Sequence, residues 1–205
     1  MVYAVDVGSI RRGHLGWAGR GVEAHDDAWE SGVDLDTLVA AVGVTLDKGT
    51  SVALGFECPL FIPVPHEQIR LGGARTNEGN RPWSAGAGAS VLASGTAQFA
   101  WTLRELGQSR PELGATVSWP RFCAGGANLL LWEAFVTQGG SGGTHIEDAK
   151  HAVNAFIGAL PDLRAKSAVT TNEPLSIIGA SMIWAGLSVD PEGLHAMPIV
   201  IRTNK

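Results

Sequence analysis

Two acidic residues lie in apolar segments that are predicted to be strands. Asp6 is the one charged residue of VYAVDVG, residues 2–8, and Glu57 lies near the end of SVALGFECP, residues 51–59. A carboxylate in an apolar strand is costly to bury unless it is paired, bound to a metal or at a surface. Carboxylate oxygens are the ligands that hard cations such as Mg²⁺ prefer. These two acids are therefore the first candidates for chemistry.

A third acid, Asp148, lies near the start of a predicted helix over residues 144–160. Thr144 and Glu147 have the S/T-x-x-E spacing of a capping box, which gives Glu147 a structural role at the helix start. Asp148 is not used by that cap. Because sites in open α/β sheets form at the carboxyl ends of strands, we expect the three acids to meet at one edge of the sheet.

Each acid also has an ordinary structural explanation, which the sequence leaves open. Asp6 could form an ion pair with Arg11 or Arg12. Glu57 could be an exposed residue at the end of its strand, and Asp148 could interact with the helix dipole. The joint pattern is more informative than any single member.

The acids need a sheet that brings strand ends together. Predicted strands at 2–8, 14–20 and 21–25 have tight connections, which favours an antiparallel meander. Strands and helices then alternate, which favours parallel pairing through right-handed crossovers. The later predicted strands are 51–59, 115–120, 129–137 and 198–203, and the predicted helices are 34–46, 91–106, 144–160 and 174–186.

Composition narrows the function classes. Of 205 residues, 45% are hydrophobic and 17% charged, which is typical of a folded protein. The net charge of −5 means that binding to nucleic acid would depend on a local patch or a metal. With no signal peptide and no apolar run of about eighteen residues, we expect a single cytoplasmic domain, residues 1–205. Cys58 and Cys123 are expected to be reduced, buried thiols.

The placement of the acids resembles the ribonuclease-H-like superfamily. The segments YAVDVGS, GFECP and HIEDAKHAVNAF put an acid in the first strand, at the end of the fourth and at the start of the last core helix. Within that superfamily the chain is most similar to a poorly characterised group of predicted ribonuclease-H-like nucleases. In that group a Glu-containing strand resembling LLLWEAFVT precedes the helix. The resemblance covers about residues 2–160.

The resemblance implies an α/β fold with a five-stranded mixed sheet, antiparallel in its first three strands and then parallel, followed here by a C-terminal helix and strand. It also implies hydrolysis of a phosphodiester by two Mg²⁺ or Mn²⁺ ions about 4 Å apart. Asp6, Glu57 and Asp148 would hold the metals. Glu133 is either a fourth metal ligand or an ion-pair partner, and Glu147 competes with it for the ligand role.

The long segment 63–90 supplies the candidate substrate contacts. Arginine binds phosphate bidentately and tryptophan stacks on bases. The candidates are Arg70, Arg75, Arg81 and Trp83. The alternative is a solvated loop without a binding role. The expected substrate is nucleic acid or another phosphodiester, and the oligomeric state, a homodimer included, stays open.

Two further function classes fit the same residues. DVGSIRRG also resembles the first phosphate-binding hairpin of the actin-like ATPase and sugar-kinase superfamily. A non-catalytic ribonuclease-H-like module would bind a ligand without turnover. Serine hydrolase or zinc chemistry is not expected, because the sequence has neither GxSxG nor HExxH. The six histidines are expected at the surface or satisfied locally, with His151 close enough to Asp148 to support it.

Overall fold

The computed structural model describes residues 1–24, 28–79, 82–136, 143–189 and 191–203. The strands are β1 (Val2–Asp6), β2 (Gly16–Arg20), β3 (Glu30–Gly32), β4 (Val52–Phe56), β5 (Phe61–Pro63), β6 (Ala115–Thr116), β7 (Leu129–Val136), β8 (Pro174–Ser176) and β9 (Val200–Thr203). The helices are α1 (Leu35–Asp47), α2 (Gly86–Ser109), α3 (Trp119–Cys123), α4 (His145–Ala159) and α5 (Ile177–Trp184), with 3-10 turns η1 (Ile10–Arg12), η2 (Gln68–Arg70) and η3 (Pro191–His195). Among the helices of these ranges, none combines the length and apolar character that a membrane span requires.

Within the described ranges, seven strands form one mixed sheet in the order β3-β2-β1-β4-β7-β6, with β9 also paired to β7. β2 runs antiparallel to both β1 and β3, whereas β4, β7, β6 and β9 pair in parallel. The prediction of an α/β fold with an antiparallel and then parallel sheet is confirmed. The sheet has more strands than the five that the resemblance implies, because β6 and β9 both add to β7. β5 and β8 form a separate antiparallel pair.

The third strand lies later in the chain than predicted. Residues 21–24 form a turn, in which the Ala24 N–H donates to the Gly21 carbonyl, and the strand is β3 instead. The remaining residue of the predicted strand lies outside the described residues. A glycine at the start of the segment favours a turn over a strand, which explains the difference.

Some helix boundaries and one cysteine also differ from the sequence-based expectations. The predicted helix at 174–186 begins at Ile177, because Ser176 caps α5 and the residues before it pair with β5. α3 follows β6 where the sequence predicts a longer strand. Cys58 is buried as expected, whereas Cys123, at the end of α3, is exposed.

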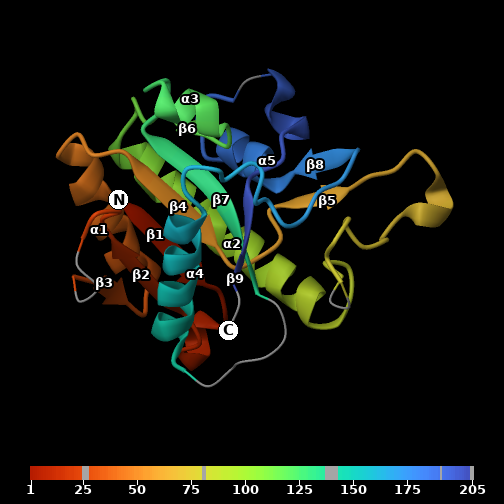
Figure 1. Ribbon diagram of the computed structural model, residues 1–205, viewed down its shortest axis with the longest axis horizontal. Coiled ribbons are helices and arrows are strands. Elements are labelled where there is room, and N and C mark those ends of the chain that lie inside the picture. Colours follow the sequence, from red (N-terminus) through yellow and green to blue (C-terminus); the bar gives the residue numbers. More distant parts are fainter. Residues whose placement is uncertain (25–27, 80–81, 137–142, 190, 204–205) are drawn as a thin grey trace.

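Helices cover both faces of the sheet. α4, teal in Figure 1, lies in front of the strands and packs its apolar side against a core that includes Ala4 and Trp132. α1 and α2 lie on the opposite face, where their side chains form a core with Val5 and Phe56. Successive side chains of a strand point to opposite faces, so Asp6, two residues after Ala4, faces α4.

Gly16 in β2 allows the first turn of α4 to lie against the sheet. A Cβ atom on Gly16 would lie 2.4 Å from the His145 carbonyl carbon and 2.5 Å from the Ile146 nitrogen. We expect Gly16→Ala to lower the free energy of unfolding by about 1–3 kcal/mol, because the methyl group overpacks a backbone contact. Gly158→Ala, where a Cβ meets nothing within 4 Å, is the control and should keep or raise stability. Urea unfolding measures both, and equal stabilities would contradict the prediction.

Candidate functional site

Asp6 lies at the carboxyl end of β1, on the sheet face covered by α4. It is 8% exposed, and its Oδ2 lies 2.5 Å from Nδ1 of His145, the first residue of α4. Such a partner offsets the cost of burying a carboxylate. The ion pairs with Arg11 or Arg12 that the sequence leaves open are not found in the described part of the chain, where both arginines are exposed.

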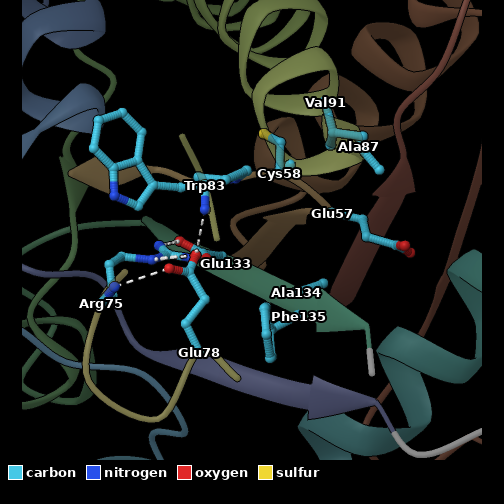
Figure 2. Close-up of a pocket in the computed structure, with 12 residues that line it drawn as sticks. Glu57, Cys58, Arg75, Glu78, Trp83, Ala87, Val91, Glu133, Ala134 and Phe135 are labelled. Atoms are coloured by element: carbon cyan, nitrogen blue, oxygen red, sulfur yellow. Dashed lines mark hydrogen bonds and ion pairs between the residues drawn. The ribbon is translucent and has the colours of Figure 1, made fainter. Parts of the chain in front are cut away.

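Glu57 directly follows β4 and lies beside Asp6. The register pairs Val5 with Phe56, and the Glu57 N–H donates to the Val5 carbonyl at 2.8 Å. Asp6 and Glu57 therefore occupy equivalent positions on neighbouring strands, which lie about 4.8 Å apart in a sheet. Glu57 follows Phe56, which packs beneath α1 and α2, and Glu57 is also among the residues that line the pocket beside Glu133 and Arg75. Figure 2 shows its carboxylate pointing away from the ion pairs around Glu133.

Asp148 lies in the first turn of α4, three residues after His145 and so on the same side of the helix. The Thr144 hydroxyl accepts a hydrogen bond from the Glu147 N–H, as predicted, but the Glu147 carboxylate binds Lys150 at 2.8 Å. Asp148 is half-buried. The first turn of α4 therefore brings an imidazole and a carboxylate to the edge where β1 and β4 end.

Of the three predicted catalytic acids, Asp6 ends β1, Glu57 follows β4 on the neighbouring strand, and Asp148 lies in the first turn of α4. In the described ranges, no group of three His, Cys, Asp or Glu side chains lies close enough together to hold a metal ion. The strand register places Glu57 beside Asp6, but the three acids do not form one set of ligands among these residues. Instead, the Asp6 carboxylate contacts the His145 imidazole.

Glu133 lies in the middle of β7, on the opposite face of the sheet from Asp6. It is two residues after Leu131, which belongs to the core beneath α1 and α2. Glu133 is 1% exposed, and its carboxylate binds the Arg75 guanidinium at 2.8 and 2.9 Å and the Leu60 N–H at 2.9 Å. Of the two roles that the sequence leaves open, the structure therefore contains the ion pair. A ligand role beside Asp6 is inconsistent with this placement.

Arg75 is buried and does not contact solvent, which corrects its predicted role in substrate binding. Its Nε donates to Glu78 at 3.0 Å, and its Nη2 lies 2.9 Å from the same carboxylate. Its Nη1 also donates to the Phe61 carbonyl at 3.3 Å. With the two bonds to Glu133, the guanidinium donates four hydrogen bonds in all, and both of its carboxylate partners lie within ion-pair distance. The side chain therefore joins the segment before α2 to β7.

In the cluster of Arg75, Glu78 and Glu133, two carboxylates bind one guanidinium group. Burial lowers the pKa of Arg75, but the two carboxylates more than offset this and keep that pKa above its ordinary value. Burial raises the pKa of Glu133, against the opposing effects of Arg75 and the Leu60 N–H. Burial also raises the pKa of the neighbouring Cys58 thiol well above its ordinary value. Cys58 is therefore not an activated nucleophile.

A pocket lies beside this cluster, between β7 and the start of α2. Figure 2 shows Trp83 over the ion pairs, with Ala87 and Val91 of α2 on another side. The Trp83 indole N–H donates to the Gly73 carbonyl at 2.9 Å, and its backbone N–H donates to Glu78 at 3.1 Å. Trp83 is therefore held within its own segment rather than presented as a free stacking surface.

Arg70, another predicted substrate contact, does not lie beside the acids at the ends of β1 and β4. Arg70 is exposed and pairs with Glu67 at 3.2 Å. It belongs to η2, and the segment around η2, in yellow, extends away from the sheet in Figure 1. Arg81 lies outside the described residues.

The sequence does not predict that two histidines, His14 and His145, lie at this site. His145 contacts Asp6, and the His14 ring lies 5.5 Å from the His145 ring. His151, which was expected to support Asp148, is exposed on α4. The available signal was the spacing of His145 and Asp148 in the first turn of one helix, directly after the capping residue.

Comparisons with known proteins do not identify a relative. No protein-family model, no curated protein and no solved structure matches the chain. The function is therefore inferred from the geometry and chemistry of the residues described above.

Proposed function

We propose that the protein is a Mg²⁺- or Mn²⁺-dependent phosphodiester hydrolase, a nuclease, built on a ribonuclease-H-like core. Support for the core comes from the strand order β3-β2-β1-β4-β7, in which an antiparallel meander is followed by parallel strands. In this proposal β6, α5 and β9 are additions around that core. Fold alone does not imply function, so the proposal depends on the site.

One observation carries the proposal. Asp6 and Glu57 occupy equivalent positions at the carboxyl ends of neighbouring parallel strands, and Asp148 lies in the first turn of α4, the turn whose His145 contacts Asp6. Carboxylates placed near one another repel, and a divalent cation bound between them would offset that repulsion.

The chemistry of these residues fits a hard cation. Asp6, Glu57 and Asp148 would hold it through carboxylate oxygens, which Mg²⁺ and Mn²⁺ prefer over nitrogen or sulfur. When bound, such an ion activates water and stabilises the charge that develops on a phosphodiester. His145 contributes by fixing the orientation of the Asp6 carboxylate from α4.

Calorimetric titration with Mn²⁺ tests the proposal on the intact protein. We expect binding to the wild type and an affinity at least about tenfold lower in Asp148→Asn, because a carboxylate ligand is lost. Glu147→Gln is the matched control, since Glu147 lies in the same turn but pairs with Lys150 at the surface. Absence of Mn²⁺ binding to the wild type, or equal affinities in all three proteins, would refute the proposal.

A second candidate is a non-catalytic module of the same fold. It is favoured by the lack, among the described residues, of three potential ligands close enough to hold a metal. A module of this kind would bind nucleic acid without hydrolysing it in Mg²⁺ or Mn²⁺. The same calorimetry, combined with a hydrolysis assay, separates the two candidates.

A further inference from the structure

The loop that joins β1 to β2 carries two exposed positive charges. Arg11 and Arg12 end the 3-10 turn η1, and both are exposed. Within the described chain, neither side chain forms an ion pair or a hydrogen bond. This contrasts with Arg75, which is fully buried in ion pairs, and with Arg70, which pairs with Glu67.

The loop is held in one shape by contacts at its base. The Ser9 carbonyl accepts hydrogen bonds from the N–H groups of Arg12 and His14, both at 3.0 Å. Gly13 has a φ of 69°, which favours glycine, and ends the turn. From α2, the Gln98 side chain donates to the Gly8 carbonyl at 2.7 Å. A loop fixed in this way presents its arginines with little loss of entropy on binding.

The loop is also adjacent to the proposed catalytic acids. It begins two residues after Asp6, and the His14 ring lies 5.5 Å from the ring of His145, the partner of Asp6. In Figure 1, η1 lies next to the first turn of α4. The two arginines thus form a local cationic group on a protein whose net charge is −5.

We infer that the loop over residues 8–14 binds the phosphodiester backbone of a nucleic-acid substrate through Arg11 and Arg12. This inference rests on the proposed function and assigns its substrate contacts. Guanidinium groups bind phosphate oxygens with charge-assisted hydrogen bonds, often in pairs. Placed beside the acids, these contacts hold the backbone next to the carboxylates, which would themselves repel it. The inference thus assigns the substrate contacts to this loop rather than to Arg70, Arg75 or Trp83.

The test is fluorescence anisotropy with a short labelled single-stranded oligonucleotide, over a range of salt concentrations and in EDTA, so that binding does not depend on a metal. For Arg11→Ala/Arg12→Ala we expect about tenfold weaker binding, since two charged hydrogen-bonding groups are lost. We also expect the slope of log K against log salt to become shallower by about 1.4, because each phosphate contact on a single strand contributes about 0.7.

Two further variants show whether the effect is local. Arg70→Ala/Arg164→Ala makes the same change in net charge at exposed arginines elsewhere and should bind as the wild type does. Arg11→Lys/Arg12→Lys keeps the charge and should retain the salt slope. Equal weakening in both alanine pairs, or no weakening in the Arg11/Arg12 pair, overturns the inference. Thermal unfolding of each variant checks that the loop residues do not affect folding.

Competition with ATP and with inorganic phosphate identifies the source of the phosphate. The inference requires that the oligonucleotide bind more tightly than either competitor, and ATP binding at equal or higher affinity overturns it. Hydrolysis separates this result from the proposed function. Oligonucleotide binding that needs Arg11 and Arg12, without cleavage in Mg²⁺ or Mn²⁺, refutes the enzyme alone. If Arg11→Ala/Arg12→Ala cleaves the oligonucleotide and binds it as tightly as the wild type does, the loop assignment alone is refuted.

Discussion

Replacing Asp6 by Asn is expected to reduce metal-dependent cleavage of an oligonucleotide by about a thousandfold or more. The reason is that Asp6 is the most buried of the three acids and lies between Glu57 and the first turn of α4. In the proposed site, losing its negative charge would remove a cation ligand. Stabilisation by a metal amounts to several kcal/mol, and about 1.4 kcal/mol corresponds to a factor of ten in rate. Rates at saturating Mn²⁺ measure the effect.

Asparagine preserves the shape of the Asp6 side chain, so Asp6→Asn should still fold, which thermal unfolding checks. His145→Ala separates two kinds of chemistry. If a cation held by the acids is responsible, His145→Ala loses much less activity than Asp6→Asn, and EDTA abolishes cleavage by the wild type. Activity that survives EDTA and is lost equally in both variants would instead assign the chemistry to an Asp6–His145 acid–base pair.

Replacing Arg75 by Ala is expected to lower the free energy of unfolding by about 3–5 kcal/mol, because it leaves buried carboxylates without their cation. Glu133 and Glu78 are both buried, and the Arg75 side chain is 0% exposed. Arg75 also stacks over the Phe61 ring at 4.6 Å, so packing is lost together with charge. Urea unfolding at neutral pH measures the change.

The matched control is Arg70→Ala, because Arg70 lies in the same segment but forms an exposed ion pair with Glu67. Exposed ion pairs contribute about 0–1 kcal/mol, so this variant should unfold close to the wild type. A loss below about 1 kcal/mol in Arg75→Ala would show that the cluster does not hold the segment to β7. Retained Mn²⁺ binding in a folded Arg75→Ala protein would agree with its distance from the acids at β1 and β4.

Two groups of acidic residues differ in their partners. Glu133 and Glu78 bind Arg75 beneath the segment before α2. Asp6 and Glu57 lie side by side at the ends of β1 and β4, where Asp6 contacts His145. In the proposed function, the catalytic carboxylates belong to the second group, which is adjacent to the exposed loop 8–14.

Much of the fold and part of the candidate site follow from local sequence signals. The apolar segment that ends in Asp6 predicts β1, and the capping residues Asp34 and Thr144 predict where α1 and α4 begin. The alternation of strands and helices after the meander predicts parallel pairing, which brings Glu57 beside Asp6. The strand and cap signals depend on residues a few positions apart, and the parallel pairing depends on the order of the elements along the chain, so both can be read from the sequence.

Only the tertiary structure decided which charges meet. Glu133 and Arg75 are 58 residues apart, and Asp6 and His145 are 139 apart. Their pairing depends on strand register and on which face a side chain occupies, and a shift of one residue would reverse every face. It also depends on how helix α4 and the segment before α2 pack against the sheet. Such long-range contacts are set by burial over the whole chain, so the partners of these charges cannot be read from local spacing.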